Sequence, residues 1–303
     1  MQPRNKLILE FWDRSKELNI KNKEYMDFVK KFLTFLLKED IKNGDLTTSS
    51  IINRQKDISA TIIAKENGIL AGTEEFSLLN KDLRIKRLKK DGDKIKNNDV
   101  LIEIKGNAKK ILERERTSLN LLQRMSGIAT LTHDLVKKLN NKAKLAATRK
   151  NLWGLLDKKA VSIGNGLTHR LNLSDGIIIK DNHLKIFNHN IENVMDSVKN
   201  KSKYIEIEVE NKKQAICAAR IIKKLSNNEN LFALMLDNIR PEEIKSIVDE
   251  LKNQNLYNNL LLEASGGINP NDLKRYSDCG VDAISMGFLT NSAKALNISQ
   301  EIK

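Results

Sequence analysis

The sequence has little of what would place it in a membrane or in an oxidising compartment. Its 303 residues include only two cysteines, Cys217 and Cys279, which lack the spacing of a disulfide framework or a metal site. No apolar run approaches the roughly 18 residues of a membrane-spanning helix, and Glu10, Asp13 and Glu17 interrupt the place where a signal peptide would have its apolar core. We therefore expect a cytoplasmic protein without a membrane partner, whose cysteines pack in its core.

Aromatic residues are also scarce, at 5% of the chain, although the net charge of +14 is strongly basic. Basic proteins often bind nucleic acid, but the recognised binding modules combine their charge with aromatic residues or a structural motif. Here the lysines are spread over the whole sequence, with no interleaved aromatic residues and no recognisable module. We expect a solvated basic surface and no nucleic-acid partner. A basic nucleic-acid-binding protein on a degenerate barrel stays open as the alternative outside enzymes.

The N-terminal part of the chain predicts a helical extension followed by a small β-rich domain. Apolar residues recur at helical spacing up to about residue 40, where the turn Asn43-Gly44-Asp45 follows. Leu46-Thr47-Thr48 then leads into short alternating segments at 58–64, 68–72, 83–88 and 100–104. Helical spacing returns at 108–139, where Ser126-Gly127 indicates either a break or close packing. We place a domain boundary at this dipeptide.

From Leu145 onward, short apolar runs recur, and each is followed by polar or small residues. The first intervals are about 30 residues long, the length of one strand–loop–helix unit, and Pro241 stands where one of the intervening helices would begin. Repeated units of this kind predict parallel strands, in an α/β barrel or in a doubly wound sheet. We favour the barrel because it gathers all the strand ends at one mouth.

Three kinds of chemical group stand at these strand ends. Arginine forks and other cationic side chains can clamp carboxylates or phosphates, and the candidates are Arg149, Lys150, His169, Arg170 and Lys180. Glu208 and Asp237 can hold Mg²⁺ against a polyphosphate. The loops Ser265-Gly266-Gly267 and Ser285-Met286-Gly287 can cradle a phosphate with their backbone N–H groups. Together these groups predict the transfer of a phosphorylated sugar.

Each of these signals also has an ordinary interpretation. Asp237-Asn238 is typical of a turn, and the alternating Glu206 and Glu208 are typical of a solvated strand face. Arg116 lies on the helix predicted at 108–139, where it looks like one more solvated charge. His183 is typical of a hydrogen-bonding residue at a strand end. The joint placement of the polar groups at successive strand ends is what favours a site.

The motifs at these positions resemble those of the quinolinate phosphoribosyltransferase family. They run in unbroken order from Glu39 to Ile302 and comprise EDIKNGDLTT, ERTSLNLLQRMSGIAT, TRK, THR, IIIKDNH, IEIEVE, MLDN, EASGGI and GVDAISMGFLT. The resemblance implies an α/β fold, with an N-terminal α/β sandwich domain and a C-terminal incomplete parallel α/β barrel. We expect the sandwich with its helical extension at 1–126, the barrel at 127–288, and a tail at 289–303 that packs back on the N-terminal domain.

The resemblance also implies the reaction and the partners. Quinolinate and phosphoribosyl pyrophosphate would react with Mg²⁺ as cofactor to give nicotinate mononucleotide, pyrophosphate and CO₂, a step of NAD synthesis. The protein would be a homodimer, or a larger assembly built from dimers, in which each N-terminal domain closes the site of the neighbouring subunit. Arg116 would reach that neighbouring site and contact quinolinate.

Carried over by matching position, the resemblance assigns a role to each motif residue. The carboxylate clamp would comprise Arg149, His169, Arg170 and Lys180, with Thr148 beside it. Lys150 would face phosphoribosyl pyrophosphate. Lys180, Glu208 and Asp237 would be the catalytic residues, and the latter two would also hold the ribose and the Mg²⁺. The 5′-phosphate would bind at the two loops Ser265, Gly266, Gly267 and Met286, Gly287, Phe288.

The chain departs from the family pattern between Asn151 and Lys158. The usual continuation after TRK resembles TTPGLRLLEK, whereas here it is two residues shorter and lacks the proline and an arginine. This difference affects the shape of the loop beside the clamp, so a related phosphoribosyltransferase that acts on another acidic base stays open as the alternative among enzymes. No charged clamp position is lost, and we expect activity.

Overall fold

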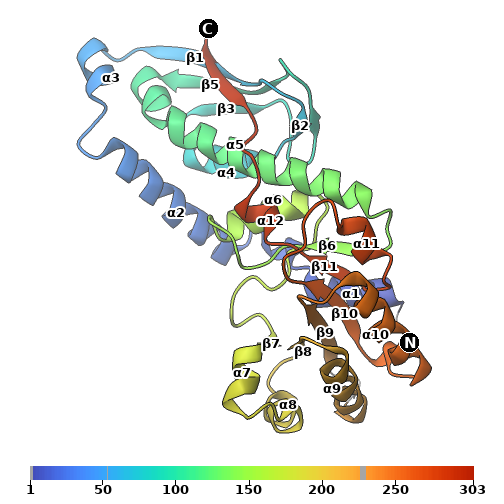
Figure 1. Cartoon of the computed structure of the whole chain (residues 1–303). Coiled ribbons are helices and arrows are strands. Elements are labelled where there is room, and N and C mark those ends of the chain that lie inside the picture. The colour runs from blue at the N-terminus through green and yellow to red at the C-terminus, as the bar shows by residue number, and fades with distance from the viewer. Residues whose placement is uncertain (1–2, 53, 226–229) are drawn as a thin grey trace. The chain divides into compact units, whose positions relative to one another are not determined.

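The computed structural model describes residues 3–52, 54–225 and 230–303, which form two compact units (Figure 1). One unit, here called the barrel unit, contains the chain up to Arg14 together with Asp134–Lys150 and Gly166–Phe288. The other, the sandwich unit, contains Ser15–His133, Asn151–Asn165 and Leu289–Lys303. The division after Phe288 coincides with the expected one, and the tail at 289–303 belongs to the sandwich unit. The grouping differs in that the chain up to Arg14 joins the barrel unit, residues 151–165 join the sandwich unit, and the division expected at residue 126 lies after His133.

The difference at residue 126 has a simple physical origin. Helix α5 (Ala108–Lys138) is continuous through Ser126 and Gly127. A Cβ atom on Gly127 would lie only 2.1 Å from the carbonyl oxygen of Lys294, so the glycine permits a close approach of two segments within the sandwich unit. Ser126-Gly127 therefore marks close packing and not a break.

A six-stranded parallel sheet forms the centre of the barrel unit. Its strand order is β6-β11-β10-β9-β8-β7, so the sheet follows the chain from β7 to β11 and adds β6 beyond β11. The strands are β6 (Lys144–Ala146), β7 (Ile177–Ile179), β8 (Tyr204–Val209), β9 (Leu231–Asp237), β10 (Leu261–Ser265) and β11 (Ala283–Ser285). With β6 and β7 as its two edges, the sheet is the predicted incomplete parallel barrel.

Short helices connect these strands, as the repeating pattern predicts. They are α7 (Asp181–Ile186), α8 (Ile191–Val198), α9 (Lys212–Leu225), α10 (Pro241–Asn253), the 3₁₀ turn η2 (Tyr257–Asn259) and α11 (Leu273–Ser277). Pro241 occupies the first position of α10, where its missing N–H costs nothing. Of the two cysteines, Cys279 is buried as expected, but the prediction for Cys217 was wrong, since its position on α9 is exposed.

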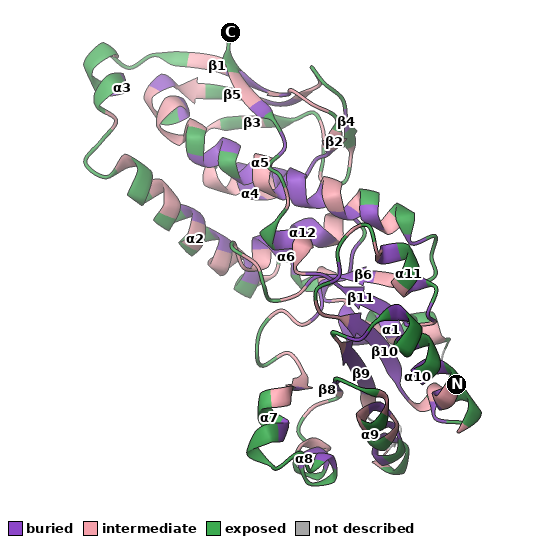
Figure 2. Cartoon of the chain, viewed as in Figure 1, coloured by how far each residue is buried: buried purple, intermediate pink, exposed green. Residues whose placement is uncertain are grey.

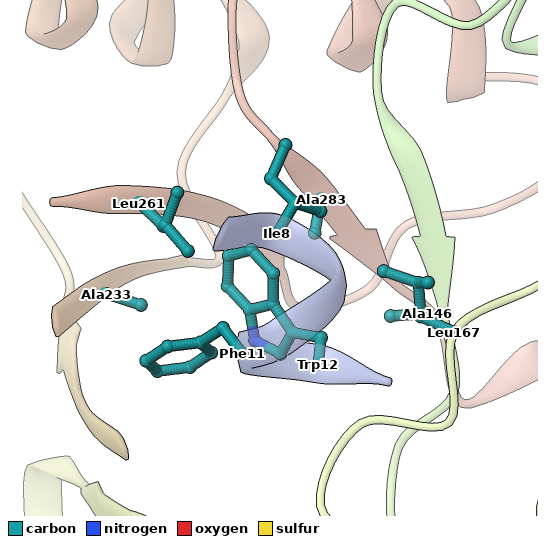
Figure 3. Packing of buried hydrophobic residues seen from close by; sticks show 8 residues of the cluster. All are labelled: Ile8, Phe11, Trp12, Ala146, Leu167, Ala233, Leu261 and Ala283. Atoms are coloured by element: carbon teal, nitrogen blue, oxygen red, sulfur yellow. The ribbon is translucent and has the colours of Figure 1, made fainter. Parts of the chain in front are cut away.

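The core of the barrel unit includes the N-terminal helix α1 (Arg4–Trp12). Ile8, Phe11 and Trp12 from this helix are buried against the sheet, as Figure 3 shows. They pack with Ala146, Leu167, Ala233, Leu261 and Ala283. These contacts involve the first residues of β10 and β11, Leu261 and Ala283, and the last residue of β6, Ala146.

The sandwich unit is built on an antiparallel sheet of strand order β12-β1-β5-β3. Its strands are β1 (Asp57–Ala64), β3 (Arg84–Arg87), β5 (Val100–Asn107) and β12 (Ile298–Ile302), and β2 (Gly68–Ile69) and β4 (Lys94–Ile95) form a separate small ladder. The C-terminal strand β12 pairs with β1 over Ala60 to Ala64. Figure 2 shows that α5 buries one face along this unit and exposes the other.

The helices of the sandwich unit differ in part from the expectation. They are η1 (Ser15–Glu17), α2 (Lys23–Ile41), α3 (Leu46–Ile51), α4 (Thr73–Leu79), α5, α6 (Leu155–Ile163) and α12 (Phe288–Asn291), which begins in the barrel unit. The predicted helical extension is thus two helices, because α1 ends at Trp12 and Asn22 caps a new start at α2. Among the described residues, no helix combines the length and apolarity that crossing a membrane requires.

Candidate active site

A pocket of about 410 Å³ lies at the C-terminal ends of the barrel strands. Its lining comes from the segments that follow or end successive strands, as the barrel prediction requires. The lining residues are Thr148, Arg149, Lys150, His169, Arg170, Ile178, Lys180, Glu208, Met235, Asp237, Asn238, Glu263, Ser265, Gly266, Gly267 and Ser285. The structure therefore brings together every predicted clamp residue of the barrel unit, both predicted metal ligands and the first phosphate loop.

The remaining predicted residues lie elsewhere. Met286 is buried, with 2% of its surface exposed, and neither it nor Gly287 and Phe288 line the pocket, where Ser285 takes their place. Arg116 is exposed on α5, in the sandwich unit. The ligand contacts of these four residues stay predictions.

The basic side of the pocket contains two arginines whose charges repel each other. The Nη1 group of Arg170 donates to the Gly176 carbonyl at 3.0 Å, but its Nε group is buried and finds no partner among the described residues. Burial, together with the positive charge of Arg149, lowers the pKa of Arg170. An anionic ligand would supply the acceptor that the buried Nε group lacks, and it would offset the repulsion between the two arginines.

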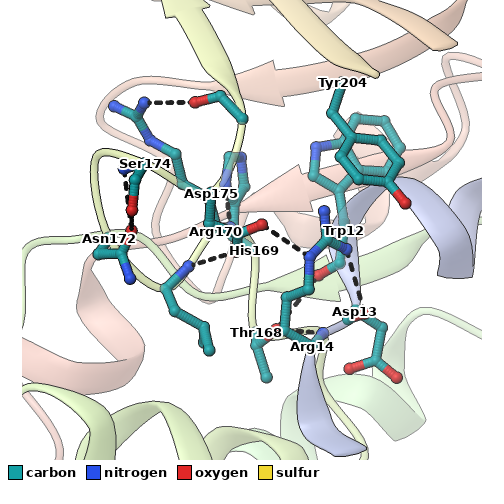
Figure 4. Close-up of polar contacts among 12 residues, drawn as sticks. Trp12, Asp13, Arg14, Thr168, His169, Arg170, Asn172, Ser174, Asp175 and Tyr204 are labelled. Atoms are coloured by element: carbon teal, nitrogen blue, oxygen red, sulfur yellow. Dashed lines mark hydrogen bonds and ion pairs between the residues drawn. The ribbon is translucent and has the colours of Figure 1, made fainter. Parts of the chain in front are cut away.

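The loop that carries Arg170 is braced on both sides, as Figure 4 shows. Arg14 makes an ion pair with Asp175 at 2.9 Å and donates its backbone N–H to the Thr168 hydroxyl at 2.8 Å. Asp175 in turn accepts the backbone N–H of Leu171 at 2.9 Å. These contacts fix the segment on either side of His169 and Arg170, so the clamp is preorganised.

Two carboxylates, those of Glu208 and Asp237, line the same pocket. Glu208 is 7% exposed and makes an ion pair with Lys180 at 2.9 Å. Burial raises the pKa of Asp237, although the positive charges of Lys180 and Lys150 oppose the shift. Two carboxylates that face one pocket fit Mg²⁺, which is usually bound by one or two protein carboxylates with water and substrate phosphates.

The phosphate loop predicted after β10 has a backbone that only glycine adopts readily. Gly266 has a φ of 86° and Gly267 a φ of 59°, both in the left-handed region. A Cβ atom on Gly266 would lie 2.5 Å from the backbone nitrogen of Asn238. The Ser285 hydroxyl donates to the Ser265 hydroxyl at 3.0 Å, which joins the ends of β10 and β11. The loop is therefore close-packed and leaves backbone N–H groups at the mouth of the pocket.

A buried cluster below the clamp was not predicted from the sequence. The Nε2 atom of His169 lies 3.0 Å from a carboxylate oxygen of Glu263 and 3.4 Å from one of Glu206. All three residues are at least nine-tenths buried, as is Glu208, so the ordinary interpretation of Glu206 and Glu208 as a solvated strand face, which stood open beside the predicted site, was wrong. A glutamate inside the apolar run LLLEA was the signal that could have indicated Glu263, because an ionisable residue in a buried strand needs a partner.

Two effects on His169 act in opposite directions. Burial lowers the pKa of His169, whereas the attraction of Glu263 raises it. Against this, the backbone N–H of Arg170 donates to Nδ1 at 2.9 Å, and Nδ1 cannot accept once it is protonated. Burial and the charge of Glu263 also raise the pKa of Glu206 to about 7. We therefore place the extra proton of the cluster on Glu206 and keep Nδ1 free.

The segment that departs from the family pattern belongs to the sandwich unit. Asp157 is fully buried and accepts from Arg124 at 2.8 Å and 2.6 Å. It also accepts the backbone N–H groups of Leu152 and Trp153, each at 3.0 Å. One carboxylate, in the first turn of α6, thus holds the shortened loop and α5 together.

Comparisons with known proteins agree with this geometry. Two family models match, "Quinolinate phosphoribosyl transferase, N-terminal domain" over residues 45–126 and "Quinolinate phosphoribosyl transferase, C-terminal domain" over residues 128–301. A protein of Arabidopsis thaliana named "Nicotinate-nucleotide pyrophosphorylase [carboxylating], chloroplastic" is 36% identical over 289 residues, which cover 90% of this chain and 82% of the relative. A relative from Methanothermobacter thermautotrophicus, named "Probable nicotinate-nucleotide pyrophosphorylase [carboxylating]", is 37% identical over 288 residues, 92% of this chain and 99% of its own length.

Solved structures show the same fold. The nicotinate-nucleotide pyrophosphorylase of Francisella tularensis is similar with a TM-score of 0.78 at 33% identity, over 91% of this chain and 96% of that one. NadC from Streptococcus pyogenes is similar with a TM-score of 0.80 at 31% identity, over 91% and 96% of the two chains. With both family models matched in order and relatives this similar over nearly their whole length, the chain belongs to the quinolinate phosphoribosyl transferase family.

Proposed function

We propose that this pocket transfers the phosphoribosyl group of phosphoribosyl pyrophosphate to quinolinate, with loss of CO₂, and so makes nicotinate mononucleotide for NAD biosynthesis. The observation that carries the proposal is the unpaired, buried Nε group of Arg170 beside Arg149, in a pocket that Glu208 and Asp237 also line. Family membership supports the same reaction.

The charges of the substrate match the basic side of the pocket. Quinolinate has two carboxylates, and removing each from water costs several kcal/mol unless a cation pairs with it. Arg149 and Arg170 offer planar guanidinium groups that can bind a carboxylate through two hydrogen bonds. Lys180 adds a third charge from the end of β7. The ring of quinolinate would thus be gripped on its anionic edge.

The phosphoribosyl pyrophosphate would occupy the other side of the pocket. The glycine backbone of Ser265-Gly266-Gly267 offers N–H groups to the 5′-phosphate, and Lys150 faces the same ligand. Glu208 and Asp237 would hold Mg²⁺ and the ribose hydroxyls. When bound, Mg²⁺ neutralises the charge of a pyrophosphate group.

The reaction follows from charge alone. The ring nitrogen of quinolinate attacks C1′ of the sugar while the pyrophosphate departs, through a transition state with oxocarbenium character that nearby carboxylates tolerate. The positive charge on the ring nitrogen then stabilises the electron pair that stays on the adjacent ring carbon when its carboxylate leaves as CO₂, and that carbon takes up a proton from solvent to give nicotinate mononucleotide. No protein base is needed for this step. The pocket accordingly has to bind the two substrates, align them and exclude water. The braced loops favour this because they are held in place before the substrates bind.

The place of Arg116 suggests a shared site. It is exposed on α5 and does not line the pocket of the barrel unit. We propose that the protein is a homodimer in which Arg116 of one subunit contacts quinolinate in the pocket of the other.

The test is incubation of the purified protein with quinolinate, phosphoribosyl pyrophosphate and Mg²⁺, followed by measurement of nicotinate mononucleotide and of CO₂. Equal amounts of both products are expected. Turnover of nicotinate without CO₂ would instead indicate a related phosphoribosyltransferase. Steeply salt-dependent binding of duplex DNA without any turnover would favour the nucleic-acid alternative.

A further inference from the structure

Both ring nitrogens of His169 are engaged inside the protein. Nε2 lies 3.0 Å from Glu263, and Nδ1 accepts the backbone N–H of Arg170 at 2.9 Å. The side chain is only 7% exposed although it lines the pocket. His169 therefore has no free N–H to donate to a carboxylate of the substrate, and its contribution to the pocket has to be indirect.

The hydrogen bond to Nδ1 selects one tautomer of the imidazole. A nitrogen that accepts an N–H carries no proton, so the proton of the neutral ring sits on Nε2. Nε2 faces Glu263 at 3.0 Å and Glu206 at the longer distance of 3.4 Å. Glu263 is fully buried and supplies the nearer acceptor, which holds the ring in that orientation.

The same hydrogen bond shapes the backbone at the clamp. His169 has a φ of 54°, in the left-handed region that a residue with a Cβ atom rarely adopts. Its own backbone N–H donates to the Trp12 carbonyl at 2.7 Å, and the next N–H turns towards the imidazole. The ring thus stabilises the turn from which the Arg170 side chain projects into the pocket.

We propose that Glu263 is a positioning residue for the clamp: by accepting the Nε2 proton of His169, it fixes the imidazole whose Nδ1 holds the Arg170 backbone, and it thereby places the Arg170 guanidinium for a substrate carboxylate. The proposal rests on the proposed function in one respect, which is that the ligand of Arg170 is quinolinate.

The cluster also has the composition of a metal site, since ligand atoms of His169, Glu206 and Glu263 all lie within 4.8 Å of one another. A metal on Nε2 would have to replace the proton that binds Glu263, and because Nδ1 accepts an N–H and carries no proton, the ring would then be an imidazolate anion. Metal analysis of the purified protein separates the two cases. A stoichiometric transition metal that is lost in Glu263→Gln would overturn the positioning role.

The first experiment measures the tautomer directly and needs no substrate. The chain has four histidines, so ¹⁵N labelling of histidine gives a spectrum simple enough to assign by mutation. His183 is an internal reference, because its Nδ1 also accepts a backbone N–H, that of Lys180 at 2.9 Å, but its side chain is exposed. We expect His169 to show a protonated Nε2 in slow exchange with water and an unprotonated Nδ1 at pH 8. A proton on Nδ1 would overturn the proposal.

The second experiment separates position from charge with two variants of Glu263. Glu263→Gln keeps an oxygen that can accept the Nε2 proton, whereas Glu263→Ala removes it. Losing one hydrogen bond that places a clamp residue should raise the KM for quinolinate about tenfold in Glu263→Ala. The KM for phosphoribosyl pyrophosphate should change by less than about twofold. Glu263→Gln should recover most of the difference and keep the slowly exchanging Nε2 proton.

Several outcomes would contradict the positioning role. If Glu263→Gln is as impaired as Glu263→Ala, the negative charge and not the acceptor is what matters. If the two KM values rise together with a fall in melting temperature, the residue acts only in folding. Should Glu263→Ala fail to fold, the wild-type spectrum and Glu263→Gln still decide. A wild-type protein that shows the predicted tautomer but no turnover would refute the proposed function and leave the tautomer assignment intact.

Discussion

Replacing Lys180 by alanine should change the stability of the protein little and its catalytic activity strongly. The Lys180 amino group lies 2.9 Å from Glu208, but 49% of the Lys180 side chain is exposed. Ion pairs with such exposure contribute about 0–1 kcal/mol, because water screens them. We therefore expect a change in melting temperature of no more than about 2–4 °C.

The effect on turnover should be much larger. A bound substrate excludes water from the pocket, and a hydrogen bond to a charged group then contributes about 1.5–3 kcal/mol. The loss of Lys180 also leaves Glu208 without its cation, next to the anionic substrates. A fall of about 100-fold or more in kcat/KM follows from these two effects, which amounts to loss of turnover in most assays.

The assay is the formation of nicotinate mononucleotide at several concentrations of quinolinate. The matched control is Lys185→Ala on the same helix α7, because Lys185 pairs with Asp181 at 2.8 Å and does not line the pocket. The control should keep wild-type kinetics. Wild-type kcat/KM in folded Lys180→Ala, or an equal loss in both variants, would refute the clamp.

Three further predictions test the assembly, the fold and the buried cluster. Mixing Arg116→Ala chains with Lys180→Ala chains should restore up to about a quarter of wild-type activity through heterodimers with one intact site, and no recovery on verified mixing would argue against a shared site. Asp157→Asn breaks a buried pair and leaves the charge of Arg124 uncompensated, which costs about 3–5 kcal/mol, so calorimetry should show a melting temperature roughly 10 °C lower; an unchanged value would contradict the role of this pair. The stability of the wild type should fall more steeply between pH 5 and 7 than that of Glu206→Gln, as measured by chemical denaturation.

The clamp could be predicted because parallel strands bring residues that are distant in the sequence to the same edge of the sheet. Lys180, Glu208, Asp237 and Ser265 each end or follow a strand, and the C-terminal ends of parallel strands meet at one edge of the sheet. A sequence that alternates apolar runs with polar endings therefore already specifies which side chains share a pocket. No knowledge of side-chain packing was needed for this step.

The short helices of the sandwich unit could not be predicted in the same way. Helix α3 has six residues and α4 has seven, so neither shows two full turns of apolar periodicity. The start of α3 depends on Asp45, which accepts the Thr48 backbone N–H at 2.9 Å. Asp45 also belongs to the turn Asn43-Gly44-Asp45, and the sequence alone does not distinguish a turn residue from a helix cap at this position.

Buried charges were the other limit of sequence interpretation. Lys159 looks like a solvated helix residue, yet it pairs with Glu74 and Glu75 at 2.7 Å each, inside the sandwich unit. The Tyr25 hydroxyl donates to the same Glu75 at 2.8 Å. These partners lie far apart in the sequence, so no local pattern distinguishes such a lysine from an exposed one. The His169 cluster in the barrel unit escaped notice for the same reason.

The pH dependence of stability depends on the sign of the pKa shifts in that cluster. Burial and the charge of Glu263 raise the pKa of Glu206 from 4.5 to about 7, so the folded protein holds a proton that the unfolded chain releases. A raised pKa contributes stability in full below the unfolded value, and the contribution is lost as the pH rises through the folded value. The loss between about pH 5 and 7 belongs to Glu206, and glutamine cannot titrate, so Glu206→Gln should lose less stability in this range. Groups that do not interact with Glu206 are common to both proteins and cancel in the difference. An equal slope in the two proteins would show that Glu206 carries no raised pKa and that the cluster does not hold the extra proton.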